Sequence, residues 1–273
     1  LDDSPITIDK NLTIDASSLP NGVTITATGK LMEILSGATV SLVGLTLADS
    51  NAPSWQPEAI KNYGELTCTD CTVSGNTQAF HNFGTLTLIN TTVSGNSGAD
   101  VGAGLVNWGT ATLRHTTLCN NDSTDYGGGI HNGGTLTLEN SIVAMNSVIT
   151  SSPADIYNNP GSTIVPLGAN LIGDNSSVEA WFPAGPLHGE PGSPVDPRLG
   201  ALDDNGGSTQ TMALSRDSLA VDAAIPTGSS PATDQRGVAR PKGPEDDLGA
   251  YELSKIAVTN ANDSGAGSLR EAI

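Results

Sequence analysis

The sequence is poor in aromatic residues, in positive charge and in cysteine, and each shortage excludes a kind of core, partner or cross-link. Only 4% of its 273 residues are aromatic, so a core has to be built mainly from Leu, Val, Ile and Ala. Eleven Lys and Arg stand against 29 Asp and Glu, a net charge of −18. This balance disfavours a nucleic-acid partner, whose phosphates need clustered cations. Three cysteines cannot form a disulfide scaffold. No apolar run approaches the ~18 residues of a membrane span.

A short repeat fills the middle of the chain. Four copies and a fifth, looser one are aligned by an asparagine at Asn62, Asn82, Asn107, Asn132 and Asn158. Residues 6–15 and 21–29 look like earlier, degraded copies. The copies are 20 to 26 residues apart, a spacing typical of a solenoid, in which each unit contacts its neighbours in sequence.

Within each copy the apolar residues alternate with threonine. Leu88, Leu113 and Leu138 are expected to point inward while the threonines before them point outward. A single unit cannot bury its apolar face, but a stack of units can. The sequence therefore predicts an all-β fold, a right-handed parallel β-helix (β-solenoid) with irregular C-terminal strands and a capping tail. The right-handedness is expected because parallel crossover connections are right-handed. A β-sandwich, the competing architecture, would need hairpins and antiparallel pairs.

The domain boundaries follow from the repeats. We expect parallel β-helix coils over residues 1–195, the C-terminal part of the same solenoid domain over 196–254, and a linker or capping segment over 255–273. Two series of asparagines are expected to bend the chain in the left-handed conformation and to hydrogen-bond along the axis. The second series is Asn76, Asn96, Asn121 and Asn146. Glycines that follow the first series, Gly64, Gly84, Gly109 and Gly134, are expected to relieve the same bend.

Several motifs in the second half carry a family resemblance. They are NLIGD (170–174), DPRLGALDDNGGSTQTMAL (196–214), DSLAVDAA (217–224), TDQRGVARP (233–241) and DDLGAYE (246–252). With these motifs the chain resembles secreted, repeat-bearing bacterial proteins that have a choice-of-anchor Q domain. The resemblance implies a surface or extracellular protein and no catalytic activity.

The last residues look like the start of a following unit. Residues 258–273 resemble the segment that opens such domains, and Ser268 with Glu271 three residues later forms a helix-capping pattern. We expect this junction to cover the end of the next unit, so that copies join head to tail. Its residues are Ser268, Leu269, Arg270, Glu271, Ala272 and Ile273. A tail that merely links two units is the alternative.

Three further features have both a functional and a structural interpretation. Tyr63, Phe83 and Trp108 occupy one coil position and form either a surface aromatic strip, suited to sugars or to lateral packing, or a stack that stabilises the turns. Cys68 and Cys71 are small core residues or a local disulfide. Acidic turns at 202–207 and 244–249 are candidates for calcium, with solvated turns as the alternative. No other cofactor is indicated.

The function predicted from these features is structural. A lyase needs a calcium-binding carboxylate cluster and a base, and a glycosidase needs two nearby carboxylates. Between residues 11 and 195, the basic side chains besides histidine are Lys30, Lys61 and Arg114. Carboxylates such as Glu65, Asp70 and Glu139 occupy different coil positions and form no ladder on one face. We predict a non-enzymatic, extracellular or cell-surface structural or adhesive repeat unit that stacks head to tail. Its partners would be copies of itself and cell-surface polysaccharide. The alternative is a carbohydrate-binding or polysaccharide-cleaving β-helix.

Overall fold

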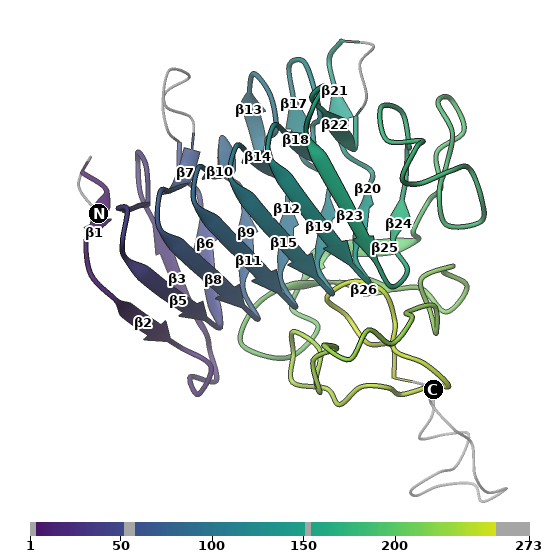
Figure 1. The fold of residues 1–273 in the computed structure, drawn as a ribbon. Helices are drawn as coiled ribbons and strands as arrows, with labels where there is room; N and C mark the ends of the chain where they lie inside the picture. Colours follow the sequence, from purple (N-terminus) through teal and green to yellow (C-terminus); the bar gives the residue numbers. More distant parts are fainter. Residues whose placement is uncertain (1–3, 52–57, 151–153, 255–273) are drawn as a thin grey trace, which may run out of the picture.

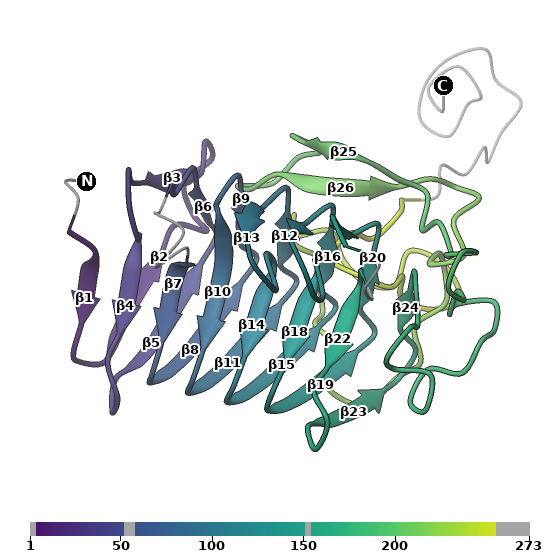
Figure 2. The ribbon, with the colours of Figure 1, turned by 90° about the horizontal axis from the view of Figure 1, so that it is seen from above.

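The chain winds into a parallel β-solenoid, as the repeats predict (Figures 1 and 2). The computed structural model describes residues 4–51, 58–150 and 154–254. Each coil contributes one strand to each of three seven-stranded sheets, here named A, B and C, in which neighbouring strands are parallel and come from successive coils.

The three sheets share one order along the rod. Sheet A consists of β1 (Ile6–Ile8), β4 (Met32–Ile34), β7 (Glu58–Asn62), β10 (Gln78–Asn82), β14 (Leu105–Asn107), β18 (Ile130–Asn132) and β22 (Ile156–Asn158). Sheet B consists of β2 (Leu12–Asp15), β5 (Thr39–Val43), β8 (Glu65–Thr69), β11 (Thr85–Ile89), β15 (Thr110–Arg114), β19 (Thr135–Glu139) and β23 (Thr163–Leu167). Sheet C consists of β3 (Val23–Thr26), β6 (Leu45–Ala48), β9 (Thr72–Ser74), β12 (Thr92–Ser94), β16 (Thr117–Cys119), β20 (Ile142–Ala144) and β24 (Leu171–Ile172).

A fourth, small sheet widens three of the coils beyond sheet C. It consists of β13 (Ser97–Ala99), β17 (Asp122–Ser123) and β21 (Ser147–Val148).

The core is built from columns of equivalent residues. Leu88 pairs in register with Leu113, which pairs with Leu138, and all three side chains are fully buried. The predicted vertical stacking is confirmed. Phe80 is among the largest fully buried side chains of this continuous core. Each buried Leu or Phe stabilises the fold by roughly 1.5–3 kcal/mol relative to exposure.

The bends are made by residues other than those predicted. The positive φ values that follow sheet C belong to the residue before each second-series asparagine: Gly75 (67°), Gly95 (69°), Asn120 (57°) and Met145 (60°). The glycines after the first series have no positive φ. They are needed because the coils approach closely: a Cβ on Gly84 would lie 2.1 Å from the carbonyl oxygen of Gly64. The predicted left-handed role of these asparagines and glycines was therefore wrong.

Residues 174–195 close the end of the solenoid that follows β24. Val178 and Phe182 are 0% and 2% exposed and belong to the main core, and Trp181 packs against it. The apolar interior that the last coil would leave open is thereby covered.

Residues 196–254 add no further coil. They form an arm that begins with an antiparallel hairpin of β25 (Leu199–Asp203) and β26 (Thr211–Leu214). Figures 1 and 2 show the arm, in green and yellow, lying lengthwise against one side of the solenoid. A second cluster of buried apolar residues, which includes Met212, Ala220 and Leu248, joins the arm to the last coils.

Candidate functional site

Two ladders of buried asparagine side chains run along the axis. In the first, the Nδ2 of each asparagine donates to the Oδ1 of the next, from Asn62 through Asn82, Asn107 and Asn132 to Asn158, at 2.7–2.8 Å. The second runs from Asn76 through Asn96 and Asn121 to Asn146 at 2.8–3.0 Å. The predicted axial hydrogen bonds are confirmed. Because these amides are satisfied inside the protein, they are structural and present nothing to a ligand.

The arm docks on a column of threonines in sheet C. Thr72 Oγ1 donates to the carbonyl oxygen of Gln210 (2.5 Å) and accepts from Gln235 Nε2 (2.9 Å). Thr92 Oγ1 donates to Gln235 Oε1 (2.7 Å), and the backbone N–H of Ala250 donates to Thr117 Oγ1 (3.0 Å). Each of these contacts with the threonine column is a hydrogen bond between neutral groups.

The charged residues of the resembling motifs brace the arm internally. Asp234 accepts from Arg236 Nε (2.9 Å) and from the backbone N–H of Glu252 (2.9 Å). Arg240 and Glu252 form an ion pair at 2.9 Å, and both side chains are 1% exposed. A buried pair of this kind is costly to break, because the remaining charge would be left without a partner. The presence of these charged residues in the motifs is thus explained by their role in folding the arm.

The aromatic strip lies at the border of sheets A and B. Tyr63, Phe83 and Trp108 are 39%, 42% and 47% exposed. The rings of Tyr63 and Phe83 stack, with centroids 5.1 Å apart and planes inclined by 12°. Trp108 instead leans over Gly133, where its Cζ3 lies 2.2 Å from the place a Cβ would take, and it contacts His131. The strip is therefore a stacked pair followed by an indole that covers the next coil.

A groove follows these rings. Beside them run the closely packed glycines, and beyond these a row of outward side chains from sheet B: Thr39, Glu65, Thr85, Thr110 and Thr135, which pair in register. Because no side chain fits on the glycines, a hollow of about 260 Å³ opens between Tyr63 and the hydroxyls of Thr39 and Thr85. The hollow reaches as far as Gly84 and Thr85, and the rows of rings, glycines and threonines continue beyond it along the surface. We call the hollow and this surface together the axial groove.

One carboxylate, that of Glu65, lines the axial groove and accepts from Thr39 Oγ1 at 3.2 Å. Lys61 Nζ lies 5.7 Å from the centroid of the Tyr63 ring but is paired with Glu58 at 3.1 Å. His81 stacks on Phe83 at 4.6 Å, and burial lowers the pKa of His81 to about 4, so its ring is neutral at neutral pH. The rings thus present apolar faces next to threonine hydroxyls and the Glu65 carboxylate.

Lys30, Glu33, Glu58 and Lys61 form a cluster of paired charges at sheet A. Lys30 Nζ lies 3.2 Å from both Glu33 Oε2 and Glu58 Oε1. Burial alone would raise the pKa of Glu58, but hydrogen bonds from the backbone and Lys61 and the charge of Lys30 lower it below its ordinary value. A general acid needs a raised pKa, so this pairing is unsuited to glycosidase chemistry.

The cysteines and the acidic turns have structural roles. Cys68, Cys71 and Cys119, all within the described residues, are buried free thiols, so the disulfide considered as one alternative is absent. In the first acidic turn Asp204 Oδ1 accepts the N–H of Gly206, and in the second Asp247 Oδ1 accepts the N–H of Asp222. In the part of the chain that the structure describes, no group of three His, Cys, Asp or Glu side chains could hold a metal ion.

The head-to-tail junction, Ser268–Ile273, lies outside the described residues, so it stays a prediction. Over 4–51, 58–150 and 154–254 no helix is long and apolar enough to cross a membrane.

Comparisons with protein-family models, with curated proteins and with solved structures give no match. The resemblance to choice-of-anchor Q proteins therefore remains an interpretation of the motifs.

The sequence predicted that the three rings share one coil position, but the groove beside them was not predicted. The signal was present, since the threonines and glycines recur at fixed positions in the aligned copies. It was overlooked because a glycine in a turn is ordinarily attributed to a bend, whereas here its lack of a side chain shapes the surface.

Proposed function

We propose that this chain is a non-enzymatic, extracellular adhesive rod that binds a neutral polysaccharide lengthwise in the axial groove. One observation carries the proposal: exposed rings, side-chain-free glycines and threonine hydroxyls run side by side along several coils. Aromatic faces pack against the apolar C–H faces of sugar rings, while hydroxyls beside them exchange hydrogen bonds with sugar hydroxyls. A polymer with a regular repeat can meet the same side chains on each coil.

The charge of the protein selects the kind of polysaccharide. With a net charge of −18, the chain repels polyanions such as uronic-acid polymers at low ionic strength. The lowered pKa of Glu58 and the structural hydrogen bonds of Asp234 favour binding without cleavage.

Affinity electrophoresis in gels that contain hydroxyethylcellulose, xylan or polygalacturonate tests the proposal. The chain should be retarded by at least one neutral polymer and not by polygalacturonate. In the double variant Tyr63→Ala/Phe83→Ala the Kd should rise about tenfold or more, because each stacked ring contributes roughly 1 kcal/mol.

Leu219→Ala is the matched control, because Leu219 is a 50% exposed apolar residue of the arm; its retardation should be unchanged. Equal retardation of the double variant and the wild type would refute the groove. Release of unsaturated products from polygalacturonate would refute the non-enzymatic part.

A further inference from the structure

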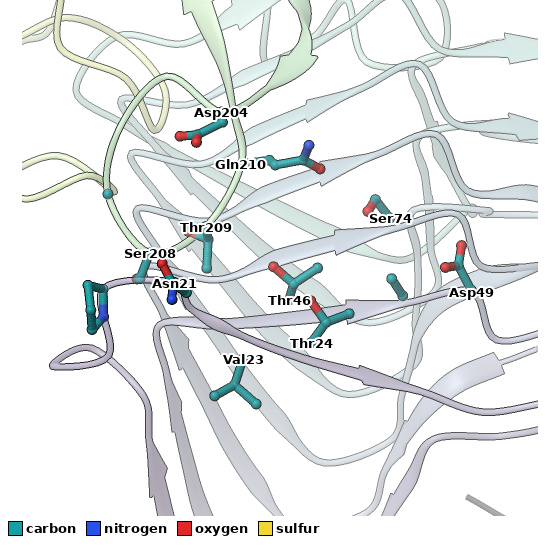
Figure 3. Close-up of a pocket in the computed structure, with 13 residues that line it drawn as sticks. Asn21, Val23, Thr24, Thr46, Asp49, Ser74, Asp204, Ser208, Thr209 and Gln210 are labelled. Atoms are coloured by element: carbon teal, nitrogen blue, oxygen red, sulfur yellow. The ribbon is translucent and has the colours of Figure 1, made fainter.

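A second groove lies on sheet C, beneath the loop that joins β25 to β26. Its volume is about 560 Å³, within the range of roughly 300–1,000 Å³ found for small-molecule sites. Figure 3 shows Thr24, Thr46 and Ser74 on its solenoid side and Asp204 and Gln210 on the loop. We call it the hairpin groove.

The hairpin groove is the uncovered end of the threonine column on which the arm docks. Thr24 pairs in register with Thr46, Thr46 with Thr72, and Thr72 with Thr92. The arm satisfies the hydroxyls of Thr72 and Thr92 through Gln210 and Gln235. Beside Thr24 and Thr46 the loop at 204–210 stands over one side of the column, with Ser208 against Gly22 and Gly44, and no side chain of the loop hydrogen-bonds to these two hydroxyls.

The polar side chains that line the groove lack partners within the protein. Among the described residues, the hydroxyls of Thr24, Thr46 and Ser74 and the amides of Asn21 and Gln210 have no hydrogen bond to another side chain or to the backbone. All five groups can both donate and accept. Asp49 and Asp204, at opposite sides of the groove in Figure 3, can only accept when they are ionised.

We propose that the hairpin groove binds a short, neutral oligosaccharide, at a site separate from the axial groove. A sugar presents several hydroxyls that each donate and accept, so it can replace the water that these solvent-accessible side chains otherwise bind, and adjacent hydroxyls can donate to Asp49 or Asp204. None of the lining residues is Lys, Arg or His, so the groove disfavours phosphate, sulfate or uronic-acid groups. An extended peptide could add to the sheet only at the free edge of β3, because the rest of the floor is the face of sheet C.

Binding without an aromatic platform is expected to be weak, with a Kd of about 1 mM. Amide NMR of the ¹⁵N-labelled full chain can detect it. The probes are maltotriose, cellotriose and N,N′,N″-triacetylchitotriose, each at millimolar concentration. At least one should shift the resonances of residues 21–26, 46–49 and 204–210 together.

Two variants locate the site. Thr46→Val/Gln210→Ala should weaken the response fivefold or more, since it keeps the β-branched shape at 46 and removes only polar groups. Thr87→Val makes the same exchange on the outer face of sheet B and should bind like the wild type. Tyr63→Ala/Phe83→Ala should also retain the response, which separates this site from the axial groove and from the proposed function.

Three outcomes would overturn the proposal. The first is that none of the three saccharides shifts these resonances. The second is that the Thr46→Val/Gln210→Ala variant responds like the wild type. The third is that a neutral Ser- and Thr-rich peptide shifts them while no saccharide does, which would assign the groove to a polypeptide.

Discussion

The second asparagine ladder ends on a buried carboxylate, and this predicts a specific dependence of stability on pH. Asp155 Oδ1 accepts from Asn146 Nδ2 (2.8 Å) and from the Asn146 N–H (3.1 Å), and Oδ2 accepts from the N–H of Asp174 (2.6 Å). The side chain is 2% exposed. Burial raises the pKa of Asp155 to about 7, and the three N–H donors only partly oppose this effect.

The sign and size of the effect follow from linkage. The folded protein holds a proton on Asp155 more tightly than the unfolded chain, whose aspartates titrate near pH 3.9. The stabilising contribution is therefore fully present below about pH 4 and is lost as the pH rises through about 7. Between pH 5 and pH 8 the free energy of unfolding should fall by roughly 2.5 kcal/mol from this group alone.

Urea unfolding at pH 5, 6, 7 and 8, followed by circular dichroism, can isolate this contribution in Asp155→Asn. The variant keeps a neutral acceptor for Asn146 but loses the acceptor for Asp174, so it should be less stable than the wild type at pH 5. Its deficit should shrink by about 2.5 kcal/mol at pH 8. Burial also raises the pKa of Asp70, to about 6, but that group is present in both proteins and cancels in the difference.

Asp100→Asn replaces an exposed carboxylate and should differ from the wild type by a constant amount across the range. A difference between Asp155→Asn and the wild type that stays constant from pH 5 to pH 8 would refute the reasoning.

Two other substitutions test the packing directly. Gly84→Ala places a Cβ 2.1 Å from the Gly64 carbonyl oxygen and should lower the free energy of unfolding, measured in urea, by about 3 kcal/mol. In the control Gly200→Ala the nearest atom is 3.6 Å from the new Cβ, so the free energy of unfolding should change by less than about 0.5 kcal/mol. Equal losses in the two variants would contradict the close-approach argument. Gln235→Ala removes hydrogen bonds to Thr72 and Thr92. It should lower the free energy of unfolding by about 1–3 kcal/mol and speed proteolysis of the arm. An unchanged cleavage rate would show that other contacts hold the arm.

The solenoid could be predicted from the sequence because its contacts repeat. A residue such as Leu113 pairs with the equivalent residues of the neighbouring coils. An alignment of the copies therefore predicts which residues pair. The asparagine ladders were predictable for the same reason. Tyr63 and Phe83 were placed correctly as neighbours because they share a coil position.

The arm could not be predicted in the same way. Gln235 contacts Thr72, which is 163 residues away, and nothing in the repeat encodes that pairing. The threonine at 72 reads as an ordinary outward strand residue, since β-branched residues favour strands whether or not another chain covers them. The hairpin groove was not predicted for this reason. It depends on which threonines of the column the arm hydrogen-bonds to, and the repeat does not encode this.

The ladders also limit how copies of the chain could join. Each ladder has a direction, because every amide donates toward the later coil and accepts from the earlier one. At the start, Asn76 Oδ1 accepts the N–H of Ser50, and at the far end Asp155 Oδ1 accepts from Asn146 Nδ2 and closes the same ladder. Phe182 covers the core beyond it. The first ladder also ends within the chain, because Asn158 Nδ2 donates to the carbonyl oxygen of Ser162. At the end that follows β24, a further copy could therefore not simply continue the ladders or the core.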